Sequence, residues 1–193
     1  MTAKALKIGF MMRPILINSI AWLLICAGAL AQDKNVGGIV YGPKAAFNIS
    51  APEGWVLDNR AGVEQGLPCV LYPEGSSWAD AKTIMYAKIT STGFTNAEAF
   101  ATRAIKEMQK THGTPKQKIA SGKTGDGHSY FINEYPATKT YSQWERVAYI
   151  QLPGAVAYIV LSARDEASYR KDNRALQDAL KSFAYLKVGG DHH

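Results

Sequence analysis

Runs of hydrophobic residues with a period of two predict much of the regular structure in this chain. In Thr83–Thr90, the side chains of Met85, Ala87 and Ile89 share one face and the residues between them share the other, as in a β-strand. Val156–Leu161 is apolar throughout, which is typical of a central strand covered on both faces. The same reasoning predicts strands at Ile39–Tyr41, Phe47–Ser50, Val70–Tyr72, Lys116–Ser121, His128–Tyr135, Trp144–Gln151 and Ala155–Ala163.

Two longer segments repeat their hydrophobic residues at helical spacing. The first, Thr95–Thr111, opens with a capping box in which the Thr95 hydroxyl bonds the amide of Glu98. The second is Asp165–Phe183, whose charged residues are expected on its solvated face. The expected apolar stripes are Ala97, Phe100, Ala101, Ala104, Ile105 and Met108 in the first helix, and Tyr169, Leu176, Leu180 and Phe183 in the second.

The order of these elements indicates the fold class. Several strands precede the first helix, and four strands separate it from the second. Because most neighbouring strands have no helix between them, we expect a largely antiparallel sheet flanked by helices, an α+β fold in a layered αβα arrangement. The loop Gly122–Gly127 contains the letters Gly-Lys-Thr, but a strand follows it, so it predicts a hairpin turn and not a phosphate-binding loop.

The beginning of the chain has the pattern of a secretory signal peptide. A positively charged start is followed by a largely apolar stretch from Ile15 to Leu30. The stretch ends in Ala29-Leu30-Ala31, an A-x-A site for signal peptidase. We therefore expect residues 1–31 to be a signal peptide and residues 32–193 to form a single domain that is periplasmic or secreted.

Alternatives to a cleaved signal peptide stay open. An uncleaved anchor is one, although Ile15–Ala31 is shorter than the roughly 20 apolar residues that span a membrane. A lipoprotein is another, although Ile25 precedes Cys26 where a small residue is needed. A start at Met11 or Met12 would give a more usual signal peptide.

The charge of the chain changes once the expected signal peptide is set aside. The sequence has 22 Lys and Arg against 16 Asp and Glu, and since Lys4, Lys7 and Arg13 lie in the signal, the net charge falls from +6 to +3. A small charge of mixed sign is only weak evidence for binding to nucleic acid or to an anionic membrane surface. We expect no nucleic acid partner and no stable membrane insertion after cleavage of the signal. The expected partner is a protein or an envelope component, and no cofactor is expected outside the cytoplasm.

Cys69 is the one cysteine of the expected mature domain, so no internal disulfide is possible there. It lies in the apolar run Leu67–Leu71, which predicts a buried thiol. A thiol catalyst with His112 or His128 is disfavoured, because an apolar setting raises a thiol pKa instead of activating the sulfur.

Motifs for other catalytic chemistry are weak. Asp126, His128 and Ser129 supply the residue types of a nucleophilic triad, but adjacent strand residues point to opposite faces, and there is no G-x-S-x-G elbow. The terminal His192 and His193 offer metal ligands without a fixed geometry, so no metal site is expected.

Aromatic residues are the better candidates for a binding surface. Trp78 follows the turn-rich loop Pro73–Ser77, and loops on a rigid scaffold frequently carry function. We predict Trp78, Trp144 and Tyr141 as binding residues, with ordinary packing as the alternative.

Three segments carry a family resemblance. Phe47–Trp55 fits the pattern F-x-I-x-x-P-x-G-W, and Tyr72–Trp78 and Leu180–Phe183 follow at suitable places. Together they resemble the PsbP-like superfamily, and more closely its small secreted bacterial members of unknown function, over about residues 37–187. The resemblance implies an antiparallel sheet between helices and a non-enzymatic accessory or binding role. It implies no catalytic residue, and the metal-binding positions of the family cannot be matched in this sequence.

These observations favour an exported, non-catalytic binding or accessory protein of the cell envelope or extracellular space. The alternative is a secreted hydrolase or metal-dependent enzyme, which requires a pocket where His112 or His128 meets a carboxylate such as Glu134 or Asp126. An anchored assembly factor is a third possibility, which retention of residues 1–31 would favour.

Overall fold

The computed structural model describes residues 37–43, 45–90 and 93–187. The expected signal peptide and the terminal histidines lie outside these residues. No helix within them is long and apolar enough to cross a membrane.

The strands are β1 (Gly38–Tyr41), β2 (Ala46–Ile49), β3 (Trp55–Asp58), β4 (Cys69–Pro73), β5 (Thr83–Ile89), β6 (Lys116–Lys123), β7 (Ser129–Tyr135), β8 (Trp144–Leu152), β9 (Ala155–Ala163) and β10 (Ala184–Leu186). The helices are α1 (Ala97–His112) and α2 (Glu166–Ser182), and η1 (Val63–Gln65) is a 3₁₀ turn.

The described strands form two antiparallel sheets. The larger has seven strands in the order β3-β4-β5-β9-β8-β7-β6, and the smaller has three in the order β1-β2-β10. The continuous apolar run of β9 lies at the centre of the larger sheet, as predicted. The expected α+β fold with a largely antiparallel sheet is confirmed.

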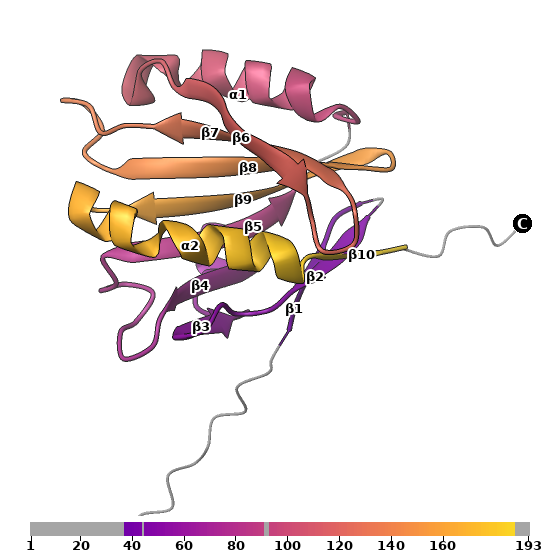
Figure 1. Cartoon of the computed structure of the whole chain (residues 1–193), viewed down its shortest axis with the longest axis horizontal. Coiled ribbons are helices and arrows are strands. Elements are labelled where there is room, and N and C mark those ends of the chain that lie inside the picture. Colours follow the sequence, from indigo (N-terminus) through magenta and orange to yellow (C-terminus); the bar gives the residue numbers. More distant parts are fainter. Residues whose placement is uncertain (1–36, 44, 91–92, 188–193) are drawn as a thin grey trace, which may run out of the picture. The chain divides into compact units, whose positions relative to one another are not determined.

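The two helices cover opposite faces of the larger sheet (Figure 1). In β8, Ala148 belongs to the core under α2, whereas its neighbours Val147 and Tyr149 belong to the core under α1. Because successive strand residues point in opposite directions, these are two separate cores on the two sides of one sheet. The core under α2 also takes in the inner face of the small sheet, where Phe47 stacks on Phe183 with ring centroids 4.6 Å apart.

Helix α1 begins later than predicted because its cap is Asn96 and not Thr95. The Asn96 side chain accepts a hydrogen bond from the backbone N–H of Ala99 at 2.9 Å. The side chain of Gln151, from β8, accepts the N–H of Ala97 at 2.9 Å and donates to the carbonyl of Thr95 at 2.7 Å. The capping box was therefore a wrong interpretation, since a residue of the sheet satisfies the first turn from outside the helix.

The segment Gly122–Gly127 contains the hairpin turn between β6 and β7, as predicted, although its first two residues still belong to β6. Gly125 lies against the end of α2, where a Cβ atom would be 1.9 Å from the carbonyl oxygen of Lys181. Next to it, the Asp126 side chain accepts the backbone N–H of Tyr185 in β10 at 2.5 Å. The loop therefore fastens the end of α2 and the start of β10 to the edge of the larger sheet.

Candidate functional site

Trp78 lies half-buried in the loop between β4 and β5. Its indole N–H donates to Oε1 of Gln65 at 3.3 Å. Gln65 is the last residue of η1, so Trp78 supports a neighbouring loop and offers only part of its ring to solvent. Its role in binding stays a prediction.

Trp144 and Tyr141 lie on opposite sides of the larger sheet. Trp144 packs on Tyr169 of α2, with ring centroids 5.5 Å apart. The Tyr141 hydroxyl instead donates to Glu145 at 2.7 Å, and Glu145, as the neighbour of Trp144 in β8, faces the other way. The fold therefore does not bring the two aromatic candidates into one surface patch.

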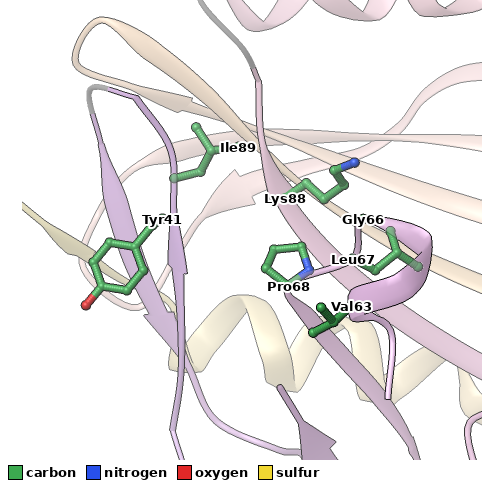
Figure 2. A pocket seen from close by; sticks show the side chains of 7 residues that line it. All are labelled: Tyr41, Val63, Gly66, Leu67, Pro68, Lys88 and Ile89. Atoms are coloured by element: carbon green, nitrogen blue, oxygen red, sulfur yellow. The ribbon is translucent and has the colours of Figure 1, made fainter. Parts of the chain in front are cut away.

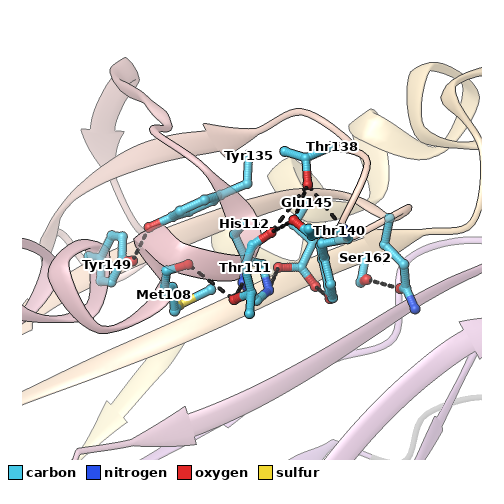
Figure 3. Close-up of polar contacts among 11 residues, drawn as sticks. Met108, Thr111, His112, Tyr135, Thr138, Thr140, Glu145, Tyr149 and Ser162 are labelled. Carbon is cyan, nitrogen blue, oxygen red and sulfur yellow. Dashed lines mark hydrogen bonds and ion pairs between the residues drawn. The ribbon is translucent and has the colours of Figure 1, made fainter.

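A polar cluster that includes His112 and Glu145 lies at the end of α1 (Figure 3). Tyr141 joins this cluster through its hydrogen bond to Glu145. Its ring lies 3.7 Å from that of His112, centroid to centroid, and Nε2 of His112 lies 3.9 Å from Oε2 of the buried Glu145. Burial, followed by the hydrogen bond to Glu145, raises the pKa of Tyr141, so its hydroxyl stays protonated and remains a donor. The cluster joins the end of α1 to β8.

His128 meets Asp126 and not Ser129. Its Nδ1 lies 3.0 Å from Oδ1 of Asp126, although the contact lacks hydrogen-bond geometry. The Ser129 hydroxyl accepts a hydrogen bond from Lys123 at 2.7 Å. These residues therefore do not converge as a nucleophilic triad requires.

Glu134, the other carboxylate considered for an enzyme, pairs with cations and a phenol. It lies 2.9 Å from Nζ of Lys116 and 3.2 Å from a guanidinium nitrogen of Arg146, and it accepts the hydroxyl of Tyr169. Burial raises the pKa of Glu134, but these hydrogen bonds outweigh burial and lower it. The group is a hydrogen-bonded, ion-paired link between the sheet and α2.

Cys69 is fully buried, as predicted. Burial raises the pKa of its thiol to about 12, so the nucleophilic thiolate is scarce at neutral pH. Among the residues that the structure describes, no three His, Cys, Asp or Glu side chains are grouped to hold a metal ion.

An apolar cleft lies between the small sheet and the segment that contains η1 (Figure 2). Tyr41 of β1 forms one side, and Val63 and the segment Gly66–Pro68 form the other, with Lys88 and Ile89 at the end of β5 completing it. Its volume is about 360 Å³, within the roughly 300–1,000 Å³ of small-molecule sites.

The apolar surface continues from this cleft onto the outer face of the small sheet. Tyr41 lies opposite Ala46 of β2, and Ala46 lies opposite Leu186 of β10. Directly opposed strand residues share a face, so Tyr41, Leu186 and Ile39 lie on the same side of this sheet. Tyr41 is 70% exposed and Ile39 41% exposed, whereas Val40 between them is buried in the core.

Sequence reasoning missed this cleft and selected other aromatic residues. A signal for it was present, because Ile39-Val40-Tyr41 is apolar on both faces of a strand too short for the centre of a large sheet. Val63, a large apolar residue in an otherwise polar segment, was the other signal.

Comparisons with known proteins concern the fold. No protein-family model and no curated protein matches the sequence. Among solved structures, the chain is similar to LpqN of Mycobacterium tuberculosis, which is described as involved in cell envelope biogenesis. The identity is 15% and the TM-score 0.50, over 77% of this chain and 89% of LpqN.

Two further solved structures are similar at lower scores. A cyanobacterial PsbP (CyanoP) from Synechocystis matches with 14% identity and a TM-score of 0.48, over 72% of this chain and 86% of CyanoP. A protein from Bacteroides thetaiotaomicron matches with 10% identity and a TM-score of 0.44, over 76% of this chain and 47% of that protein. The similar structures thus include a PsbP, from the family that the sequence motifs resemble, and at this level of identity the similarity concerns the fold alone.

Proposed function

We propose that this protein is an exported, non-catalytic accessory protein of the cell envelope that binds an apolar group of a ligand in the cleft between β1 and η1. One observation carries the proposal. Of the five large apolar side chains that are exposed in the described residues, Tyr41 and Val63 line the cleft, and Ile39 and Leu186 share the face of Tyr41 beside it.

The exposed apolar side chains around the cleft contact water in the protein without a ligand, which is unfavourable. Scattered exposed apolar residues are normal on protein surfaces, but a contiguous patch marks a site of interaction. Fully burying one side chain the size of Val63 contributes about 1.5–3 kcal/mol. A ligand that covers Val63 and Tyr41 therefore gains a driving force that needs no charged group.

The polar groups considered for catalysis support a non-catalytic role. His128 faces Asp126 in a loop that holds β10, and Glu134 is neutralised by Lys116 and Arg146. None of these residues lines the apolar cleft. A cell-envelope location is supported by the signal-peptide pattern, and LpqN, which shares the fold, is described as involved in cell envelope biogenesis.

A neutral fluorescent dye tests the proposal. Nile red is expected to bind the wild-type protein, and Val63→Asp is expected to weaken this binding at least tenfold, because it places a charge in the apolar wall. Ile119→Asp is the matched control, since Ile119 is similarly exposed, at 38%, but lies on the edge strand β6 outside the cleft. Equal loss in both variants, or no binding to the wild type, contradicts the proposal.

A further inference from the structure

We propose that the cleft receives an extended peptide segment of another protein, which pairs as an added strand with the free edge of β1 and places an apolar side chain in the cleft. This inference rests on the proposed function and adds to it the chemical class of the ligand. It makes the backbone of Ile39 and Tyr41 the part of the site that determines specificity.

The turn between β1 and β2 determines which backbone groups of β1 are bonded within the sheet. The N–H of Gly42 donates to the carbonyl of Ala45 at 2.8 Å, so these two residues form a hydrogen-bonded pair. Bonded and non-bonded pairs alternate along an antiparallel ladder. Val40 therefore bonds to β2, whereas the N–H and C=O groups of Ile39 and Tyr41 point away from β2.

Within the described part of the chain, no strand occupies this edge. The small sheet has the order β1-β2-β10, and no backbone hydrogen bond between described residues reaches the N–H or C=O of Ile39 or Tyr41. Tyr41 is the residue through which the small sheet lines the cleft, and the segment that contains Val63 lies across from it (Figure 2). The free edge of β1 therefore borders the cleft.

Two other sheet edges are closed to a further strand. Strand β6 is rich in lysine and has an irregular register after Lys116, and both features hinder edge pairing. At the far edge of the small sheet, the Asp126 side chain accepts the N–H of Tyr185 in β10. Strand β1 has neither protection, and its exposed side chains, Ile39 and Tyr41, are apolar.

Unpaired backbone groups select a peptide over other apolar ligands. A ligand that fills the cleft removes water from the N–H and C=O groups beside it, and a buried group left unpaired is unfavourable. A hydrocarbon chain offers these groups no partner. An extended peptide offers donors and acceptors at the spacing of a β ladder, and every second side chain of it faces the same side.

The size of the edge favours a peptide over a second copy of this chain. The four residues of β1 extend over about 13 Å, since a strand rises about 3.3 Å per residue. A stable interface between two folded proteins buries roughly 800 Å² on each partner, and an edge of this length is short for that purpose. A single peptide segment needs only the edge and the cleft beside it.

Peptide binding tests the assignment. The probe is a fluorescently labelled peptide with blocked ends and the sequence Thr-Val-Thr-Val-Thr-Val. Its control has every backbone nitrogen methylated, which removes the N–H donors but keeps the apolar side chains. Fluorescence anisotropy with the full-length protein is expected to show at least tenfold tighter binding of the unmodified peptide. Equal affinities would overturn the inference.

Ile39→Pro removes the outward N–H and leaves the ladder to β2 intact, because proline is tolerated where the N–H of an edge strand faces solvent. We expect this variant to bind the unmodified peptide at least tenfold more weakly but to keep Nile red binding, since Ile39 does not line the cleft. Ile39→Ala is the matched control, because it shortens the side chain and retains the N–H. It is expected to bind the peptide within about threefold of the wild type, and an equal loss in both variants contradicts backbone pairing.

Amide hydrogen exchange examines the same edge in the wild type, without a substitution. In the free protein, the N–H groups of Ile39 and Tyr41 are expected to exchange faster than that of Val40. Saturating peptide is expected to slow their exchange at least tenfold. If both are already as protected as Val40 in the free protein, the edge is occupied and the inference is wrong, and a dimer in size-exclusion chromatography would identify the occupant as a second copy.

The outcomes separate this inference from the proposed function. If Nile red binds but the peptide does not, the cleft takes apolar groups and the assignment of a peptide is wrong. If Nile red does not bind, the proposed function itself fails, whatever the peptide does.

Discussion

The indole N–H of Trp78 donates to Oε1 of Gln65 across 3.3 Å, and this contact joins two loops that strand β4 separates in the sequence. Gln65 ends the turn that begins with Val63, and Val63 forms one wall of the apolar cleft. Trp78 thus lies outside the cleft lining, in contact with the turn that forms this wall. Trp78, which the sequence indicated as a binding residue, therefore supports one wall of the cleft.

Trp78→Phe is expected to weaken Nile red binding about threefold. The phenyl ring preserves most of the packing, but the donor to Gln65 is lost, and a net hydrogen bond is worth about 0.5–1.5 kcal/mol. Dye titration measures the affinity, and the melting temperature is expected to change by only a few degrees. Trp144→Phe, on the α2 side of the sheet, serves as the control with unchanged binding. Equal weakening in both variants would contradict a local role for Trp78.

Gly125→Ala is expected to lower the free energy of unfolding by at least about 2 kcal/mol, because the new methyl group meets the Lys181 carbonyl and the loop must move. Gly127→Ala in the same loop is the control. A Cβ at Gly127 meets nothing within 4 Å, but its φ of +93° strains an alanine, so a loss of about 1 kcal/mol is expected. Urea unfolding measures both, and a larger loss at Gly127 would show that close packing at Gly125 is unimportant.

Stability in acid is expected to depend on Asp126. Burial raises the pKa of this carboxyl, but hydrogen bonds from Thr124 and the Tyr185 N–H, together with the nearby His128 ring, outweigh burial and lower it to about 2. Because the folded pKa lies below the unfolded value of about 3.9, the stabilisation is present above pH 4 and is lost as the pH falls towards 2.

Asp126→Asn measures that contribution. At pH 7 we expect the variant to be about 1 kcal/mol less stable than the wild type, a figure reduced for solvent exposure. The difference is expected to shrink as the pH falls from 4 to 2. Asp172→Asn on helix α2 provides the comparison, with little effect at either pH. A difference that stays constant with pH would argue against the lowered pKa.

Tyr169→Phe is expected to lower the free energy of unfolding by about 1–3 kcal/mol. The buried Glu134 loses a hydrogen-bond donor, and Nε of Arg146 loses its acceptor at 2.6 Å. Tyr158→Phe is the matched control, since no hydrogen bond of the Tyr158 hydroxyl is found among the described residues. Chemical denaturation at pH 7 compares the free energies of unfolding of the two variants. Similar losses would mean that the ring and not the hydroxyl matters at Tyr169.

Elements with a strong local pattern were predictable from the sequence. Strand β9 was found from its continuous apolar run, and α2 was found within one residue at each end, since Asp165 caps it and Tyr169, Leu176 and Leu180 face the core. These features depend on residues near one another in the chain, and periodicity reports them directly.

Short elements that depend on distant partners were missed or misread. Strand β10 has three residues and exists through its pairing with β2, more than 130 positions earlier in the chain. The cap of α1 depends on Gln151, which contacts Ala97 from 54 positions away. A local pattern contains no information on such contacts, because the packing of the sheet creates them.

The sequence by itself determined which residues are apolar, where the longer strands and helices lie, and that Cys69 is buried. Only the tertiary structure decided which apolar residues remain uncovered. Val40 and Tyr41 are adjacent and both apolar, yet one is buried in the core and the other is 70% exposed beside the cleft. The reason is physical: a strand presents two faces, and the small sheet packs only one of them against the core.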